Sequence, residues 1–513
     1  MLVAIFVIST SAIGFKIKTS DLEKTIKTEE IGPLSLDDTD IDPLVDLEVT
    51  VKIKEIRALD TIDKYSEPDF YVKVFIDDEV FISPTWKNQK YITDENEIWN
   101  ATKNVDDFEK DYVIIRIQLW DSNPIFDRLC DLSQNVAQTF TEEKDVLLNY
   151  SLKTGHWNGE DFITPQPTYF DRSGYGRLNG CDDNSVYKND KDCELLFDIT
   201  QTDPDGDGIP YWTEVEKFHT DPKEDDTGSD NDSDGIPIEW EFKWGYYMSY
   251  HYNSGPTYNW FYDPNEWNDH KNIDLDDDGL NNYEEYLTSQ WGSDPFRKDL
   301  FIEIDQMNGT DDIPPSLLPK KSIELLTLAH HRQNIVYHID DGCMGGSDML
   351  PFDESIEREE LPDLFKEYFL HGDEDNWRRG VFHYGLICYE AGYAGYAYGP
   401  GVGGYNGAFQ LSSNRVKKYY EGFLTKDKAT AYASVFMHET GHTLGLNGLL
   451  IGGHNRDSYH PWQINFWKWR PYKSCMNYGY CYRLVDFSDG SHGKNDFDDW
   501  ENINLGLFQE NLQ

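Results

Sequence analysis

The sequence predicts a multidomain protein made of an antiparallel β-sandwich, a segment of repeated acidic loops and a C-terminal α/β domain. Its 513 residues exceed what a single hydrophobic core usually organises. Short apolar and aromatic runs separated by polar turns fill residues 45–200, and an Asp-x-Asp-x-Asp-Gly pattern occurs three times within residues 201–296. Over residues 297–513, strand patterns alternate with amphipathic helix patterns, which is typical of an α/β domain.

The chain is strongly acidic, with 95 Asp and Glu against 45 Lys and Arg and a net charge of −50. Such a charge disfavours binding to nucleic acid, or to a bare anionic membrane, through bulk electrostatics. Cations are therefore the expected partners of this chain.

Residues 1–15, MLVAIFVISTSAIGF, form an apolar leader with the length of a signal-peptide core, although no Lys or Arg precedes it. We therefore expect a secreted or cell-surface protein in which residues 16–44 form an acidic linker or a pro-segment. The seven cysteines include no Cys-x-x-Cys pair, which favours disulfides over a cysteine zinc site. The candidate pairs are Cys181 with Cys193 and Cys475 with Cys481.

Four stretches of residues 45–200 have the composition of strands, namely DLEVTVKIKEIRAL, DFYVKVFI, DYVIIRIQLW and CELLFDIT. They predict an antiparallel sandwich with two acidic loops at one end. The segment DKYSEPDFYVKV resembles a loop and strand of C2 domains, and this resemblance covers the whole region. It implies a module for docking on a membrane or surface, with possible calcium ligands at Asp63, Asp69, Asp121, Asn123 and Asp127. The alternative is a sandwich whose acidic turns are only solvated.

Three segments, DPDGDGIPYWTE, DNDSDGIPIEWE and DLDDDGLNNYEE, place Asp at positions one, three and five, Gly at six and Glu at twelve. Carboxylates at this spacing converge on a hard cation when the backbone turns at the glycine, which is the pattern of calcium loops. An acidic surface linker is the alternative. The predicted calcium ligands are Asp203, Asp205, Asp207, Glu214, Asp230, Asp232, Asp234, Glu241, Asp274, Asp276, Asp278 and Glu285.

These loops are EF-hand-like, but long flanking helices are not evident, so the segment resembles thrombospondin type-3 repeats. The resemblance implies a structural role in which bound calcium turns an acidic segment into a rigid spacer. The aromatic stretch at residues 240–267, between the second and third loops, is expected to pack the small core that orders them. A sugar-binding platform is the alternative for this stretch.

In the C-terminal part, DLFIEID and NIVYHID have strand composition and flank an amphipathic helix pattern at residues 315–333, which predicts a β-α-β unit. The run GVFHYGLICYE adds another strand. The Gly- and Tyr-rich residues 391–410 are expected to form a flexible loop, or else to border a cleft and pair with an extended substrate.

The run DKATAYASVFMHETGHTLGL predicts a helix that carries a His-Glu-x-x-His motif. His438 and His442 are four residues apart and project from one face, so both imidazoles can reach one zinc ion. Glu439 then lies close enough to act as the general base on a water molecule. Gly445 is expected to end the helix in a left-handed conformation.

Together with the downstream segment SCMNY, this motif resembles the metzincin zinc proteases, over about the last 215 residues. The resemblance implies a zincin fold, with Met476 as the hydrophobic floor of the site and Tyr478 as a stabiliser of the oxyanion. The family spacing places the third zinc ligand at Gly448, which has no side chain to coordinate. We prefer His454, because a glycine-rich segment can carry it back to the metal; the alternatives are Asp457 and His460.

The sequence thus predicts an exported, calcium-stabilised zinc metalloendopeptidase that cleaves protein or peptide substrates and docks through a C2-like domain. One alternative is a calcium-dependent adhesion or surface-binding protein whose protease-like domain is degenerate and binds no zinc. A second alternative is zinc-dependent hydrolysis of a bond other than a peptide. No nucleic-acid partner is expected.

Overall fold

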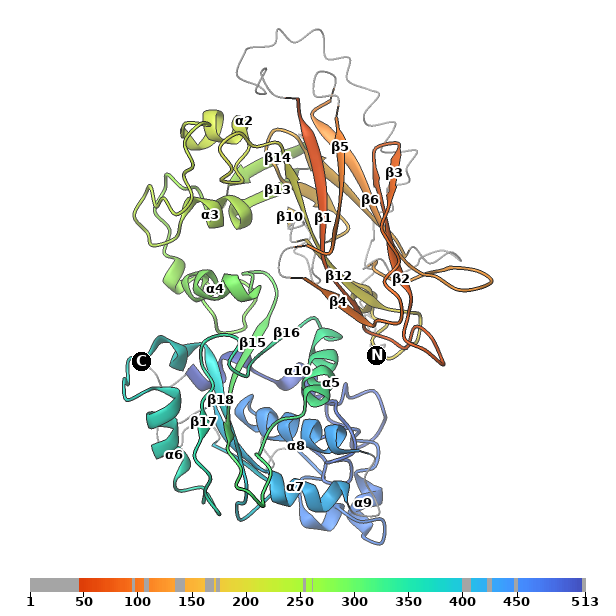
Figure 1. Ribbon diagram of the computed structural model, residues 1–513, viewed down its shortest axis with the longest axis vertical. Helices are drawn as coiled ribbons and strands as arrows, with labels where there is room; N and C mark the ends of the chain where they lie inside the picture. The colour runs from red at the N-terminus through yellow and green to blue at the C-terminus, as the bar shows by residue number, and fades with distance from the viewer. Residues whose placement is uncertain are drawn as a thin grey trace, which may run out of the picture.

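The computed structural model describes residues 46–509 apart from 95–96, 106–109, 134–143, 162–169, 172–175, 252–254, 261, 399–406, 422–426 and 447–450. The predicted leader and the predicted linker or pro-segment lie outside the described residues. Figure 1 shows the sandwich above, the α/β domain below, and the segment of acidic loops joining them along one side.

Two antiparallel sheets form the predicted sandwich. One has the order β11-β12-β1-β4, with β5 also paired to β1, and the other has the order β3-β2-β6-β8-β9, with β7 paired to β6. A 3-10 turn, η1 (Gly180–Asp183), precedes the last strand. The strands are β1 Glu48–Ala58, β2 Phe70–Ile76, β3 Glu79–Ile82, β4 Tyr91–Thr93, β5 Trp99–Asn104, β6 Tyr112–Asp121, β7 Arg128–Leu129, β8 Val146–Ser151, β9 Trp157–Gly159, β11 Arg177–Asn179 and β12 Cys193–Gln201.

The sandwich core follows from the alternation of side chains along each strand. Val49, Val51 and Ile53 of β1 are fully buried, whereas the residues between them are partly exposed. Val72 and Val74 of β2 belong to the same core from the facing sheet. Successive strand side chains point to opposite faces, so this sequence pattern buries one face of each sheet.

A short helix follows each acidic loop. After the first loop, α2 (Tyr211–Thr213) continues as the π-helical turn η2 (Glu214–Phe218), and α3 (Ile238–Gly245) follows the second. The 3-10 turn η3 (His270–Asn272) precedes the third loop, which is followed by α4 (Asn282–Thr288) and the 3-10 turn η4 (Ser289–Trp291). Each helix begins close to the glutamate at position twelve, which fixes that carboxylate against the loop.

The aromatic stretch between the second and third loops contains a hairpin that the sequence analysis did not predict. Its strands are β13 (Tyr246–His251) and β14 (Gly255–Trp260), and β13 also pairs with β10 (Phe170–Asp171). Trp240, Trp244 and Tyr262 are buried in one small cluster, as expected for a packing role of this stretch.

The C-terminal part is an α/β domain whose sheet has the order β16-β15-β18-β20-β19. The parallel strands are β15 (Asp299–Met307), β16 (Val336–Asp340), β18 (Phe382–Cys388) and β20 (Ala408–Ser412), and β17 (Met349–Leu350) pairs with β15. The strand β19 (Gly395–Ala397) is antiparallel to β20 and lies at the edge of the sheet. The predicted β-α-β unit is present as β15, α5 (Lys320–His331) and β16.

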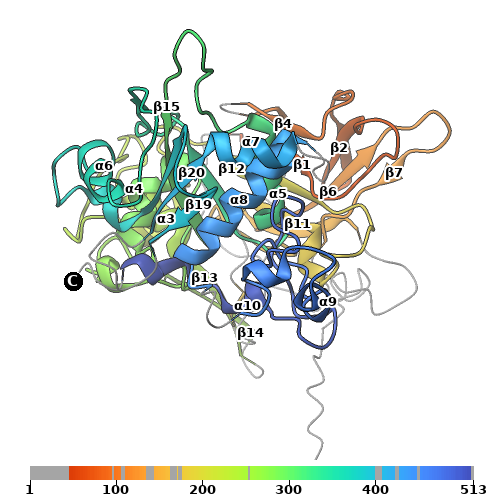
Figure 2. The same ribbon diagram turned by 90° about the horizontal axis from the view of Figure 1, so that it is seen from below.

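Helices cover both faces of this sheet (Figures 1 and 2). On one face lie α5, α7 (Ser413–Tyr420) and α8 (Lys428–Thr443), and on the other lie α6 (Leu361–Leu364) and the π-helical turn η5 (Phe365–Phe369). The helix α8 therefore rests on a rigid platform. The remaining elements are η6 Trp377–Gly380, η7 Arg456–Ser458, α9 Ile464–Lys468, α10 Asp499–Asn502 and η8 Leu505–Gln509.

The sandwich and the α/β domain meet at a buried polar junction. Glu194 of β12 is fully buried and accepts a hydrogen bond from Arg297 Nη2 at 2.9 Å, and its Oε2 lies 2.7 Å from His331 Nδ1. Beside it, Arg332 Nη2 donates to Asp60 Oδ1 at 2.7 Å. The junction thus joins the end of α5 and the residues before β15 to one end of the sandwich.

All seven cysteines are free thiols, so the predicted pairing of Cys181 with Cys193 and of Cys475 with Cys481 is wrong. Cys181 Sγ instead donates a hydrogen bond to Asp192 Oδ2. The other three thiols of these pairs pack in the hydrophobic cores of the two domains, where cysteine behaves as a small apolar residue. Among the described residues, none of the helices combines the length and the apolar character needed to cross a bilayer.

Candidate functional site

Helix α8 carries the His-Glu-x-x-His motif. Its N-cap is Asp427, whose side chain accepts a hydrogen bond from Thr430 N at 2.8 Å. The helix ends at Thr443, and Gly445 follows with φ +95. A short polar cap at the start and a left-handed glycine at the end are the usual boundaries of a helix, and both match the sequence pattern.

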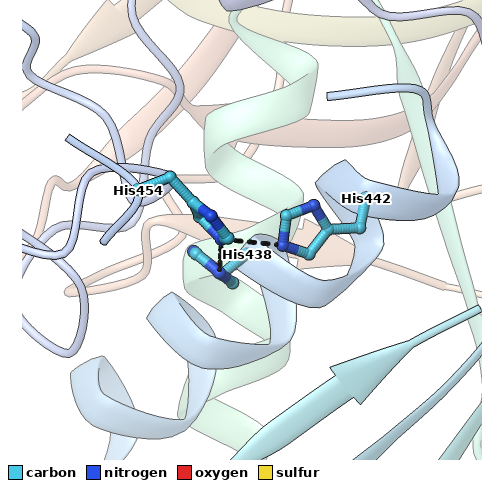
Figure 3. A group of neighbouring side chains, drawn as sticks. All are labelled: His438, His442 and His454. Atoms are coloured by element: carbon cyan, nitrogen blue, oxygen red, sulfur yellow. Dashed lines mark hydrogen bonds between the residues drawn. The ribbon is translucent and has the colours of Figure 1, made fainter. Parts of the chain in front are cut away.

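Three imidazoles converge at this helix (Figure 3). His438 and His442 project from α8, and His454 comes from the loop that follows it. Nε2 of His454 lies 3.1 Å from Nε2 of His442 and 3.2 Å from Nε2 of His438. The other ring nitrogens contact carbonyls: Nδ1 of His438 lies 2.9 Å from Cys475 O, and Nδ1 of His442 lies 2.7 Å from Leu446 O.

These contacts determine which nitrogens are free to bind a metal. A carbonyl oxygen only accepts, so Nδ1 of His438 and of His442 carries the proton and each Nε2 presents a lone pair. Hydrogen bonding alone leaves such facing lone pairs unsatisfied, whereas one cation satisfies all three. Burial lowers the pKa of each imidazole, to about 4 for His454, which keeps the metal-binding neutral form. Three convergent histidine nitrogens fit the ligand set of a catalytic zinc ion.

Glu439 follows His438 in α8, and its side chain lies against the edge strand of the sheet. Its side chain packs on Gly395 of β19, where any larger residue would collide with the carboxylate. Glu439 is only 6% exposed, and burial raises its pKa to about 8. The glycine of the edge strand therefore admits the carboxylate to a buried position against β19.

Met476 packs against α8. It is fully buried, and a Cβ on Gly441 would come within 2.7 Å of its sulfur. This close approach explains why the interior of α8 contains a glycine. The turn also contributes the Cys475 carbonyl that contacts Nδ1 of His438, so it both supports the helix and orients this imidazole ring.

Tyr478 covers the histidines from the same turn. Its ring centroid lies 4.6 Å from that of His454 and 5.6 Å from that of His438. Burial, and then the charge of Glu439, raise the pKa of the Tyr478 hydroxyl to about 12. The hydroxyl thus stays protonated at neutral pH and can donate a hydrogen bond to an anionic oxygen.

Of the three candidates for the third ligand, the structure brings His454 to the pair on α8. Asp457 is exposed in η7, and His460 stacks on Trp462 with ring centroids 4.1 Å apart. His454 follows Gly453, whose φ of +85 lets the chain turn back toward the helix.

The three acidic loops, here the first (203–214), second (230–241) and third (274–285), share one set of internal hydrogen bonds. The glycine at position six donates to the first aspartate at 2.7 Å in the first loop and at 3.0 Å in the other two. These glycines adopt φ of +89, +102 and +99, which other residues adopt only with strain. The backbone therefore wraps in all three loops as the spacing predicted.

Each loop also contains buried carboxylate oxygens that lack a hydrogen-bond partner in the described structure. They include one oxygen each of Glu214, Glu241 and Glu285, the residues at position twelve, all 0% or 1% exposed. Burial, reinforced by the neighbouring aspartates, raises the pKa of Glu214 to about 8 and that of Glu241 to about 9. A bound cation would hold such carboxylates in their ionised form, and a set of oxygen ligands fits calcium.

In each loop the aspartate at position five also accepts a hydrogen bond from a backbone N–H outside the loop, which the repeat pattern does not predict. The second oxygen of the position-five aspartate accepts a backbone N–H from Asp226 in the first loop at 3.4 Å, from Asn268 in the second at 3.1 Å and from Asp299 in the third at 2.7 Å. Asp299 begins β15, so the third loop is joined directly to the sheet of the α/β domain. The spacing of these residues differs from loop to loop, so no repeat in the sequence reveals them.

The predicted ligands in the sandwich loops lie close together, but an arginine lies among them. Asp121 is buried and accepts hydrogen bonds from Asp69 N at 3.0 Å and Asn123 Nδ2 at 2.6 Å. Arg128 Nη2 donates to Asp63 Oδ1 at 3.1 Å and to Asn123 Oδ1 at 3.3 Å. The guanidinium therefore supplies positive charge where the resemblance implied calcium.

The same two loops expose apolar side chains at their tips. Tyr65 is 91% exposed, Ile125 82% and Phe126 81%. Asp127, the last of the predicted ligands, accepts a hydrogen bond from Tyr71 OH at 2.8 Å, which anchors the base of the second loop. A group of exposed apolar tips on a polar scaffold is typical of an interaction surface.

No protein-family profile matches the chain, and no curated protein matches it. Solved structures similar to part of it include human GIVD cytosolic phospholipase A2, at 14% identity and a TM-score of 0.18, covering 30% of this chain and 16% of that one. They also include a C2 domain, at 12% identity and a TM-score of 0.17, covering 30% of this chain and 97% of that one. A calcium-bound pair of C2 domains from Extended-Synaptotagmin 2 matches at 15% identity and a TM-score of 0.18, over 30% of this chain and 46% of that one. The assignment of a sandwich rests on the strand pairing itself.

Proposed function

We propose that the protein is a zinc-dependent endopeptidase, secreted or held at the cell surface, that is stabilised by divalent cations and docked by its sandwich. The observation that supports this best is the convergence of three Nε2 atoms, with the opposite nitrogens of two rings fixed by carbonyls. Glu439, the residue after His438 in α8, supplies the carboxylate that a zinc hydrolase uses as its base, because a bound cation favours the ionised form that burial alone opposes. The resemblance of α8 and the turn at 474–478 to metzincins agrees with this assignment.

In this proposal the residues divide the work of peptide hydrolysis. His438, His442 and His454 would hold zinc, which would supply a Lewis acid for the peptide carbonyl and lower the pKa of a water molecule. Glu439 takes a proton from the attacking water and delivers it to the leaving amine. Tyr478 donates a hydrogen bond to the oxygen on which negative charge develops.

The position of β19 at the edge of the sheet favours an extended peptide as the substrate. It lies at the edge of the sheet beyond β20, and its Gly395 contacts Glu439. An extended peptide can add to such an edge through main-chain hydrogen bonds, which would place its backbone beside the base. Residues 399–406 of the same Gly- and Tyr-rich segment lie outside the described residues.

Replacing His454 by Ala is expected to remove about one zinc ion per chain and to abolish casein cleavage, because two imidazoles alone hold zinc weakly. Zinc is measured by elemental analysis of the purified protein, and cleavage by release of labelled peptides. Asp457→Ala and His460→Ala are the matched controls and should keep both properties. Full zinc and activity in His454→Ala would exclude this ligand, and absence of zinc from the unaltered chain would favour the adhesion protein.

We further propose that the sandwich docks on a lipid bilayer through its apolar tips without calcium as a bridge. Arg128 already pairs with Asp63 at the place where a bridging calcium would bind. The apolar tips supply a driving force that does not depend on a cation. A net charge of −50 argues for a zwitterionic rather than an anionic surface.

The double replacement Ile125→Ser and Phe126→Ser is expected to weaken binding to phosphatidylcholine vesicles by on the order of a hundredfold, since each buried apolar side chain contributes about 1.5 kcal/mol or more. Co-sedimentation with and without EGTA measures this. Val80→Ser, at a residue of β3 that is 47% exposed, is the control and should bind normally. Unchanged binding of the tip variant, or release by EGTA, would count against this mode of docking.

A further inference from the structure

A histidine lies against the carboxylates of the second acidic loop. His270, in η3, is only 1% exposed. Its Nε2 lies 3.1 Å from Asp234 Oδ2 and 3.9 Å from Glu241 Oε1, two of the carboxylates assigned to the loop. Ligand atoms of the three residues all lie within 4.8 Å of one another. A nitrogen donor is therefore part of a site that the sequence pattern assigned to oxygen donors alone.

Several atoms facing this space have no hydrogen-bond partner in the described structure. They are Nε2 of His270, Oε1 of Glu241 and Oδ2 of Asp232. The imidazole is enclosed by Trp240 and Tyr262, whose ring centroids lie 5.7 Å and 4.8 Å from its own. Buried polar atoms that remain unpaired are costly, and a single cation among them would satisfy all of them.

The side chain of Asn282 can hold the proton of His270 on Nδ1. The side-chain amide of Asn282 lies 3.0 Å from Nδ1 of the imidazole, and its Oδ1 is buried without a partner. Either end of the amide can face the ring, and with Oδ1 turned toward it the amide accepts a hydrogen bond from Nδ1–H. In this tautomer Nε2 directs a lone pair at two carboxylates, and a cation bound among the three groups would satisfy all of them.

We propose that the second loop is a mixed nitrogen–oxygen site that binds a first-row transition-metal dication such as Zn²⁺ or Mn²⁺ in preference to calcium, through His270, Asp234 and Glu241. Calcium takes oxygen ligands, whereas imidazole raises the affinity of a site for transition metals. The second loop is thus a mixed nitrogen–oxygen site, whereas the ligands assigned to the first loop are all carboxylates.

The position of His270 gives this ion a structural role. The first aspartate of the third loop, Asp274, follows it by four residues, and Asn282 belongs to α4, the helix after that loop. An ion held by His270 therefore links the second loop to the third. The site lies apart from α8, so the inference does not depend on catalysis.

The test uses the full chain carrying His438→Ala, His442→Ala and His454→Ala, so that the histidines of the α8 site give no nitrogen signal. Loaded with Mn²⁺, this chain is expected to show electron spin echo modulation from nitrogen-14. Labelling the histidines of this chain with nitrogen-15 should replace the nitrogen-14 modulation by nitrogen-15 modulation. The labelled chain has the same sequence, so this comparison does not depend on how another variant folds. His270→Gln is expected to remove the modulation and to weaken Zn²⁺ and Mn²⁺ binding by about tenfold or more.

Glu214→Gln in the first loop is the matched control and should leave the modulation unchanged. The proposal is overturned by the absence of nitrogen modulation, by its persistence in His270→Gln, or by calcium displacing Mn²⁺ from every loop with equal ease. All these chains lack the histidines of the α8 site. The nitrogen modulation therefore tests the second loop whether or not the protein is a zinc protease.

Discussion

Replacing Glu439 by Gln is expected to lower kcat for peptide hydrolysis by about a hundred- to ten-thousandfold while the zinc content stays at the level of the unaltered protein. The amide keeps the shape that packs against Gly395, but it cannot accept the proton of the attacking water. The histidines are unchanged, so zinc binding should persist. Steady-state cleavage of a labelled peptide and elemental analysis of the same sample measure the two quantities.

The control is Glu421→Gln, at a surface glutamate that lies 3.7 Å from Lys417 at the end of α7 and is 59% exposed in its side chain. It should keep full activity, because exposed pairs of this kind contribute little. If Glu439→Gln kept more than about a tenth of the activity with full zinc, the base would have to be another residue.

Replacing Glu194 by Gln is expected to destabilise the junction between the sandwich and the α/β domain by about 3–5 kcal/mol, because Arg297 is left as a buried charge without its carboxylate. Arg297 is 2% exposed and pairs with Glu194 at 2.9 Å. Urea unfolding followed by tryptophan fluorescence should show a lower midpoint, and limited proteolysis should cut between the domains sooner.

The matched control is Glu324→Gln, which breaks a second pair between the sandwich and α5. Lys90 and Glu324 lie 3.1 Å apart, but their side chains are 49% and 53% exposed. Solvent screens this pair, so its loss should change the free energy of unfolding by less than about 1 kcal/mol. Equal effects of the two replacements would contradict the assignment of the buried junction as the stronger contact.

The same junction predicts an acid-sensitive contact. Burial opposes ionisation of Glu194, but His331 and Arg297 outweigh it and hold the pKa of this carboxyl below its usual range. A carboxyl with a lowered pKa stabilises the folded state above its unfolded pKa of about 4.3, and this stabilisation is lost as the pH falls below that value. Urea unfolding repeated between neutral and acid pH should show that the free energy of unfolding of the unaltered chain falls as the pH is lowered. The Glu194→Gln variant should lack this part of the fall.

Features that depend on neighbours along the chain could be predicted from the sequence. The alternation of Val49, Val51 and Ile53 sets one face of a strand, and the glycine at position six turns each acidic loop. The four-residue spacing of His438 and His442 places both on one face of α8. Each of these follows from local backbone geometry, which a short stretch of sequence determines.

Features that join distant segments were decided only by the tertiary structure. Proximity along the chain could not choose among His454, Asp457 and His460, because the choice depends on how the loop after Gly445 packs. The disulfides expected from proximity in the sequence do not form, for the same reason. Three of the four cysteines pack in hydrophobic cores and do not pair with their neighbours in sequence. Chain spacing limits how far a segment can reach but not where its side chains point.

The sequence by itself thus determined the order of the sandwich, the acidic-loop segment and the α/β domain. It also determined the turns of the acidic loops and the helix that carries His438 and His442. The tertiary structure decided the third histidine, the position of Arg128 among the sandwich aspartates, the approach of His270 to the second loop and the burial of Glu194. The physical reason is that helices, strands and tight turns are governed by interactions over a few residues. A ligand set assembled from separate segments depends instead on packing between surfaces that no local pattern encodes.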